Sequence, residues 1–247
     1  MTRTSRRSRS PRGSGELLAD EIIDAATSLL LDSEAASAVS IRAVADRVGV
    51  TPPSIYLHFD DKDALLEAVC ARYFERLDEE LAAASKGIDD PLERALQMGI
   101  AYVRFAVATP VLYREAFHHV SPVAERSKVD EVLAASAFVR FTGTVSELAD
   151  AGIFGPDEAG DVVLELWTAA HGLASLMIAK PGLGWGDDFA IAAQTLRSIC
   201  LGRAVLSIRE YESPDEVRVF LDSLSAPSDH SIGQEKVKSE LERVDPR

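Results

Sequence analysis

Two hydroxyl residues, Ser40 and Thr51, stand where they could cap two short helices, and they frame the most informative pattern in the chain. Each precedes a run with one apolar face, where a Ser or Thr hydroxyl accepts a hydrogen bond from the first helical turn. Gly49 lies between the runs, and glycine readily takes the left-handed conformation that ends a helix. Two short helices joined by a tight turn form a helix-turn-helix, whose second helix enters the major groove of DNA. The chemistry expected of residues 40–59 is therefore recognition of double-stranded DNA.

Apolar and small residues would hold these two helices together. Ala45 is small where the helices must cross, and Ile55 and Phe59 lie four positions apart on the inner face of the second helix. Pro52 and Pro53 open that helix, where the N–H groups have no intrahelical acceptor in any case. The segment is therefore able to fold as a compact pair.

Elsewhere the sequence lacks the patterns of catalysis. It contains no Gly-x-Ser-x-Gly, no phosphate-binding loop and no dinucleotide fingerprint. His118 and His119 are adjacent, but no second His or carboxylate lies four residues further on, so we interpret them as a polar surface pair. We expect no enzymatic activity, no catalytic residue, no metal and no cofactor.

The formal net charge of −14 looks unsuited to a nucleic-acid ligand, but the charge is unevenly distributed. Residues 1–62 hold eight Lys or Arg and nine Asp or Glu, a net charge of −1, whereas the rest holds 18 and 31, a net charge of −13. The first 12 residues include five arginines and no acid. This arm either lies along DNA, following its backbone or entering its minor groove, or is a solvated terminus.

Apolar residues recur with helical period almost throughout, and no run alternates with period two, so we expect an all-α protein. We predict a disordered basic arm, an N-terminal three-helix helix-turn-helix domain, a further domain of six or seven helices, and a mobile tail. Their bounds are 1–15, 16–62, 63–225 and 226–247. Capping residues and prolines place helices near 17–32, 41–48, 52–58, 61–85, 91–107, 110–117, 128–151, 156–180, 188–208 and 214–224. Two distant cysteines and the lack of a bilayer-length apolar stretch favour a cytoplasmic protein with no membrane association.

The first third of the chain resembles the N-terminal signature of the TetR family of transcriptional regulators. The likeness covers about residues 17–66 and rests on residues in register with the signature: Gly49, Tyr56, Phe59, Lys62 and the pair Leu65-Leu66. Trp167, His171 and Gly172 also resemble the Trp…His-Gly motif of one ligand-domain subclass. The family resemblance implies an all-α homodimer that binds a DNA operator.

The resemblance also implies roles for residues of the helix-turn-helix. Tyr56 and Lys62 are expected to contact phosphates, and Ser40 and Thr51 to offer hydroxyls and helix N-terminal amides to the DNA backbone. The candidates to reach base edges are Arg42, Pro53, Ser54, Leu57 and His58. The alternative for the polar residues is an ordinary cap or a solvated side chain, and Leu57 either contacts a thymine methyl or is packed. Pro53 stands where the family commonly has glycine, so the operator sequence does not follow.

The resemblance implies that the six- or seven-helix domain is a ligand-binding and dimerisation domain, with an effector pocket among the aromatic residues of its middle helices. Its predicted members are Tyr102, Phe105, Tyr113, Phe117, Phe138, Phe141, Trp167 and His171. The alternative is that these side chains form only core. The resemblance also implies that the helices near 156–180 and 188–208 pair with a second chain. Small residues on the first of these helices favour close helix approach: Gly172, Ala174, Ser175 and Ala179.

The function expected is repression of transcription. A homodimer binds a near-palindromic operator, and a small, largely apolar effector releases it. A neutral or cationic effector is expected because the predicted pocket has no basic cluster, and burying an anion without a paired cation is unfavourable. One alternative is a helix-turn-helix regulator with no small-molecule effector, whose C-terminal domain serves only dimerisation. Another is an enzyme with an appended DNA-binding domain, which requires an acid–base or metal cluster in the cavity.

Overall fold

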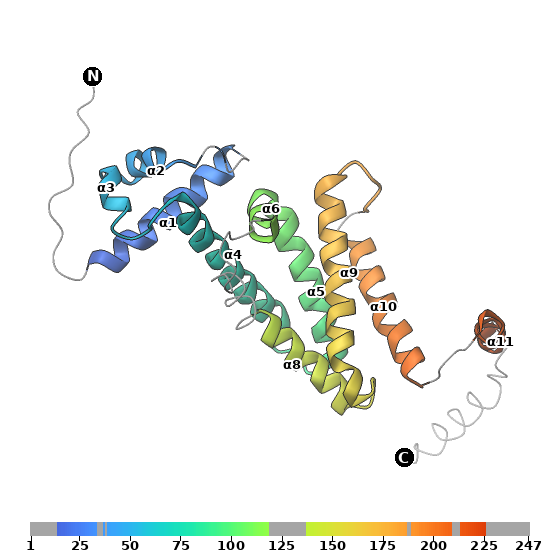
Figure 1. Cartoon of the computed structure of the whole chain (residues 1–247). Helices are drawn as coiled ribbons and strands as arrows, with labels where there is room; N and C mark the ends of the chain where they lie inside the picture. The colour runs from blue at the N-terminus through green and yellow to red at the C-terminus, as the bar shows by residue number, and fades with distance from the viewer. Residues whose placement is uncertain are drawn as a thin grey trace, which may run out of the picture. The chain divides into compact units, whose positions relative to one another are not determined.

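The computed structural model describes residues 14–33, 37, 39–118, 137–186, 189–208 and 213–225. Every regular element in those ranges is a helix, which confirms the expected all-α fold (Figure 1). Residues 1–204 form one compact unit and residues 205–247 a second. Most of the predicted basic arm, the predicted tail and His119 lie outside the described residues.

Three helices form the N-terminal part, here called the reading head: α1 (Ser14–Ser33), α2 (Ile41–Val48) and α3 (Pro52–Ile55). The Ser40 hydroxyl accepts a hydrogen bond from the Ala43 N–H at 3.2 Å, and Gly49 ends α2 with φ +80°. Ala45 and Ile55 are fully buried between the helices. The predicted second helix is too long, because α3 ends at Ile55 and the His58 N–H closes a tighter turn onto the Ile55 carbonyl.

The helix α4 (Lys62–Ser85) connects the reading head to the rest of the unit. Asp61 caps it by accepting a hydrogen bond from the Ala64 N–H at 2.8 Å. Its first half packs on α1, where Arg72 forms ion pairs with Asp20 and Asp24. Its second half packs on the helices of the body, so α4 belongs to both regions.

Five more helices and one short 3-10 turn complete the first unit, and we call them the body. They are α5 (Pro91–Ala108), α6 (Pro110–His118), α8 (Ala137–Asp150), η2 (Pro156–Glu158), α9 (Ala159–Ala179) and α10 (Ala190–Ile208, which runs past residue 204). α5 lies at the centre, in contact with α4, α6, α8 and α9. Gly99 allows α10 to approach α5, since a Cβ there would lie 2.9 Å from a Leu196 methyl. In the second unit, α11 covers Pro214–Ser225.

α9 is the one helix in the described ranges that is long and apolar enough to cross a membrane by itself. Val162, Val163 and Leu166 on this helix are buried against its neighbours, as in the core of a soluble protein. Leu164 and Leu176, on its other side, are each more than half exposed.

Candidate nucleic-acid interface and internal cavity

The most exposed apolar side chain of the reading head is Leu57, with 83% of its surface accessible. It follows α3 together with Tyr56, whose ring is 52% exposed. Pro53 and Thr51 at the start of α3 are also exposed, and this end of the unit lies far from α9 and α10 (Figure 1). The packed alternative for Leu57 is thus excluded, and an apolar contact surface stands beside the predicted phosphate contact of Tyr56.

The two helix N-termini of the reading head differ in what they can donate. At α2 the N–H groups of Ile41 and Arg42 are available, because Ser40 caps only Ala43. At α3 the first two helical residues are Pro52 and Pro53, which carry no N–H group. The expectation that Thr51 brings helix N-terminal amides to DNA is therefore wrong in that respect.

The remaining polar candidates of the reading head differ in their surroundings. The Thr51 and Ser54 hydroxyls are 3.1 Å apart and share a hydrogen bond. His58 is half-buried, with its Cε1 3.9 Å from the Cβ position of Gly15 on α1. Arg42 is exposed on α2, and Lys62 is half-buried as the first residue of α4. The structure brings these residues to one end of the unit, around the turn between α2 and α4.

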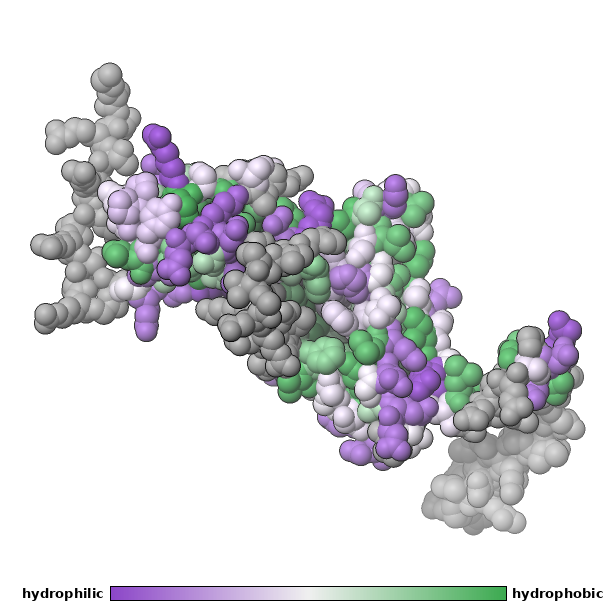
Figure 2. All heavy atoms as spheres, viewed as in Figure 1, coloured by the Kyte–Doolittle hydropathy of each residue, from purple (hydrophilic) through white to green (hydrophobic). Residues whose placement is uncertain are grey.

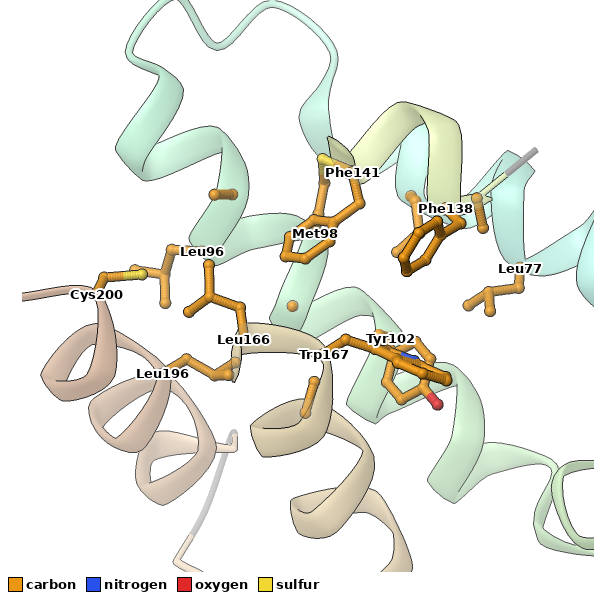
Figure 3. A pocket seen from close by; sticks show the side chains of 15 residues that line it. Leu77, Leu96, Met98, Tyr102, Phe138, Phe141, Leu166, Trp167, Leu196 and Cys200 are labelled. Atoms are coloured by element: carbon orange, nitrogen blue, oxygen red, sulfur yellow. The ribbon is translucent and has the colours of Figure 1, made fainter. Parts of the chain in front are cut away.

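A cavity of about 50 Å³, partly open to the surface, lies in the body between α4, α5, α8, α9 and α10 (Figure 3). Every residue that lines it is uncharged, and most are aliphatic or aromatic. Four predicted effector-binding residues line it: Tyr102, Phe138, Phe141 and Trp167. The sequence analysis missed further lining residues, among them Met98, Leu196 and Cys200.

Three other predicted residues, Tyr113, Phe117 and His171, form a polar and aromatic cluster beside the cavity. The hydroxyls of Tyr102 and Tyr113 lie 3.0 and 2.9 Å from Nδ1 of His171. The Tyr113 hydroxyl also lies 2.9 Å from the Ser175 hydroxyl, one helical turn after His171. The Phe117 ring meets the His171 ring edge-on at a centroid distance of 4.7 Å. Tyr102 thus belongs both to the cavity wall and to the cluster.

The two phenols of this cluster stay neutral at physiological pH. Burial raises the pKa of Tyr102, and the nearby Tyr113 raises it further. Burial also raises the pKa of Tyr113. Both hydroxyls therefore keep their protons and can donate hydrogen bonds to His171 or to a polar atom of a ligand.

Phe105, the eighth predicted pocket residue, lies elsewhere. It lines a surface groove on α4 and α5 together with Glu80 and Arg104. Its ring packs against Tyr73 at a centroid distance of 5.0 Å. The structure therefore separates Phe105 from the other seven residues.

The outer faces of α9 and α10 carry exposed apolar side chains, at Leu164 and Leu176 on α9 and at Ile191 and Leu201 on α10. Figure 2 shows hydrophobic residues at the surface of this part of the unit. Gly172 faces open space on α9, whereas Ala174 is fully buried in the body. Among the small residues considered for close helix approach, Gly172 and the exposed Ala179 are therefore available to a partner helix, and Ala174 is not.

Metal-binding clusters are not found in the part of the chain that the structure describes: no three His, Cys, Asp or Glu side chains are grouped there as metal ligands are. The two cysteines, Cys70 and Cys200, are both buried and free. Burial raises the pKa of the Cys70 thiol to about 12, with a further contribution from Glu115 and Glu67.

Comparison with known proteins agrees with this architecture. Residues 22–69 match the model of bacterial regulatory proteins of the tetR family, and residues 95–199 match a tetracyclin repressor-like C-terminal domain, together more than half of the chain. The chain is 28% identical over 180 residues to an uncharacterised helix-turn-helix transcriptional regulator of Mycobacterium tuberculosis, covering 72% of this chain and 83% of that protein. The solved structure of a protein of unknown function from Rhodococcus sp. RHA1 is 26% identical and has a TM-score of 0.68, covering 80% of this chain and all of that one.

Proposed function

The chain belongs to the TetR family of DNA-binding transcriptional regulators, and from this premise we propose that it is a homodimeric repressor that a small, largely apolar effector releases from its operator. The observation that carries the proposal is that one compact unit contains both an exposed surface around α3 and a separate cavity in the body. The proposal includes a cytoplasmic location, because a regulator of this kind must reach chromosomal DNA.

Operator recognition is assigned to the surface around α3. Tyr56 and Lys62 contact phosphates and fix the register, while Leu57 and Arg42 reach base edges. A phosphate contact explains why a lysine opens α4, where the helix dipole disfavours a cation. Ser40, Thr51, Pro53, Ser54 and His58 complete the proposed interface.

Dimerisation is assigned to the outer faces of α9 and α10. Their exposed apolar side chains leave surface that a second copy would cover, and a twofold axis makes the same patch serve both chains. Gly172 on this face permits close approach of the partner helix. Two reading heads related by a twofold axis favour a near-palindromic operator, with half-sites about one DNA turn, roughly 34–36 Å, or somewhat more apart.

Effector binding is assigned to the cavity. Its uncharged wall favours a neutral, apolar molecule, because a buried ion without a partner loses its hydration. Tyr102, Phe138, Phe141 and Trp167 provide the wall, and Tyr113, Phe117 and His171 stand behind it. Phe105 is left out of this proposal because it lines a different groove.

An effector can release DNA only if it binds more tightly to a dimer conformation in which the two reading heads have the wrong spacing for the operator. α4 links the two regions, and the ion pairs of Arg72 with Asp20 and Asp24 hold α1 to it. α6 carries Tyr113 and packs on both α1 and α4. A change around Tyr113 is therefore adjacent to the reading head as well as to α4.

One observation favours a second candidate, a regulator without an effector. The cavity of about 50 Å³ is smaller than the roughly 300–1,000 Å³ of ordinary ligand sites. In that case the cavity is a packing gap and the body serves only dimerisation. The two candidates differ in whether any small molecule weakens operator binding.

The test starts with selection of DNA from a random pool by the full chain. We expect an imperfect inverted repeat to be enriched, a dimer in sedimentation at micromolar concentration, and lower expression from a reporter that carries the selected site. A Tyr56→Ala, Lys62→Ala variant should enrich nothing. Neutral apolar compounds should then release the labelled operator, whereas multiply charged anions should not. A monomer, or release only by such anions, would contradict the proposal.

A further inference from the structure

Two hollows of the body share a wall. A surface depression of about 130 Å³ lies between the start of α5 and α10. Leu96 and Cys200 line this depression and also line the internal cavity. Figure 3 shows the Cys200 thiol on α10 directed toward Leu96 on α5. Only the thickness of these two side chains separates the cavity from the outer depression at this point.

The helix that carries Cys200 is held by few side chains. Between residues 190 and 204, the buried residues of α10 are Ala192, Leu196 and Cys200, a single row with a spacing of four. Leu196 and Cys200 face the cavity, so part of that row lies over empty space. The tight contact is between Leu196 and Gly99, and toward Cys200 the partly buried Ile199 and Ala204 also pack against the body.

Ion pairs also tie this end of α10 to the body. Arg203, three residues after Cys200, places Nη2 2.8 Å from Oε1 of Glu158 and Nη1 3.7 Å from Oε1 of Glu165. All three side chains are partly exposed, and ion pairs in contact with water contribute little stability. Local opening at this end therefore requires less free energy than unfolding of the core.

We propose that an uncharged apolar molecule enters the cavity between α5 and α10, past Leu96 and Cys200, when α10 moves outward at its Arg203 end. The inference rests on the effector function proposed above, and it identifies the wall that moves. Asp90, Glu93 and Arg197 stand at the rim of the depression, while the passage behind them is apolar. Two acids at the rim disfavour an anion, in agreement with the uncharged cavity wall.

The same motion supplies room that the cavity lacks. An effector of ordinary size needs several times the present volume of about 50 Å³, and outward displacement of α10 enlarges the cavity without disturbing α4 or α5. α10 also contributes Ile191 and Leu201 to the proposed dimer surface. Entry of the effector is thereby connected to the geometry of the dimer.

The thiol of Cys200 allows the route to be tested with N-ethylmaleimide, a small uncharged reagent. Thiolates add to its carbon–carbon double bond, and burial raises the pKa of the Cys200 thiol to about 11, so the closed state reacts slowly. Modification of Cys200 and Cys70 in the full-length dimer is followed separately by peptide mass spectrometry. Cys70 is the internal control, because it is equally buried but lies on α4, away from both hollows.

Three variants give opposite expectations. Leu92→Trp fills the outer depression and should slow modification of Cys200 about fivefold or more, whereas Arg203→Gln removes the ion pairs and should speed it about fivefold. Val139→Trp adds the same bulk to an exposed position of α8 that lines neither hollow, and should leave the rate unchanged. The rate at Cys70 should be the same in all four proteins.

An unchanged Cys200 rate in Leu92→Trp would overturn the route, as would an Arg203→Gln effect shared by Cys70, which reports general loosening. The assay needs neither operator nor effector, so its failure leaves the proposed regulation standing. Conversely, if no neutral compound releases DNA although the thiols are labelled as expected, that result would contradict the proposed effector function and still support the opening of α10.

Discussion

Tyr56 on the reading head and Tyr102 in the body carry the same phenol, but 52% of Tyr56 is exposed and 7% of Tyr102. Around Tyr56 the side chains face outward, and the partners proposed for them lie on another molecule. Around Tyr102 the hydroxyl, imidazole and aromatic rings contact one another. Substitutions in the first region should therefore change binding with little effect on stability, and substitutions in the second should change stability and response.

The largest effect is expected from Trp167→Ala, which removes a side chain shared by the cavity wall and the aromatic cluster. Loss of a large aromatic from a core lowers the free energy of unfolding by about 3 kcal/mol. Effector response should disappear while the folded variant binds its operator nearly as tightly as before. Trp185→Ala, in the connection between α9 and α10, is the matched control. If operator affinity fell together with the effector response, the two regions would not have the separate roles that the comparison assigns to them.

Lys62→Ala should show the opposite behaviour. We expect weaker binding to every DNA sequence and a slope of log K against log salt that is lower by about one per subunit, because one phosphate contact is lost. The free energy of unfolding should change by less than about 0.5 kcal/mol. Lys86→Ala, at the other end of α4, removes the same charge far from the reading face and should change neither quantity. An unchanged salt slope for Lys62→Ala would remove the residue from the interface.

Tyr113→Phe tests whether the cluster beside the cavity serves the response. Loss of the hydroxyl removes its contacts with His171 and Ser175, and the free energy of unfolding should fall by about 1 kcal/mol. Operator affinity without effector should persist, and more effector should be needed for release. Tyr73→Phe, which removes another buried phenol, should lower stability without altering the response. Equal effector responses in the two variants would show that the cluster contributes only to packing and not to effector-driven release.

The smallest effect is expected from Leu57→Ala. Because the side chain is 83% exposed, stability should not change, and operator affinity should fall by less than about 1 kcal/mol with no change in salt slope. An operator with uracil in place of thymine tests the contact directly, because the difference between the two proteins should then vanish. A difference that survives this replacement would exclude a thymine methyl as the partner.

The reading head could be predicted from sequence because its signals are local. The cap at Ser40, the left-handed Gly49 and the buried Ala45 and Ile55 all lie within 16 residues, and each has a direct backbone consequence. The shortened α3 was not predictable at that level, since an apolar residue at position 57 suits a helix as well as a turn. Its exposure depends on tertiary packing.

Predicting the cavity would have required knowledge of contacts between residues far apart in the chain. Aromatic residues on α5, α8 and α9 indicated the region, but an aromatic stripe alone does not distinguish Phe105 from Tyr102. The contribution of α10 went unnoticed because Leu196 and Cys200 are ordinary helix residues there. The available signal was the repeat of four residues along α10, from Ala192 to Leu196 and then to Cys200. The ion pairs of Arg72 were not predicted either. The available signal was that Asp20 and Asp24 lie four residues apart, on one face of α1.

Pro52 and Pro53 at the start of α3 have a consequence for the thermodynamics of recognition. Each pyrrolidine ring fixes φ of its own residue, in the unfolded chain as well as in the folded one. The shortest helix of the reading head therefore loses less conformational entropy when it becomes ordered. A preorganised surface of this kind binds with a smaller ordering penalty. It also adapts less to an altered groove, so in the proposed interface α3 should tolerate fewer changes of groove shape than a helix without these prolines would.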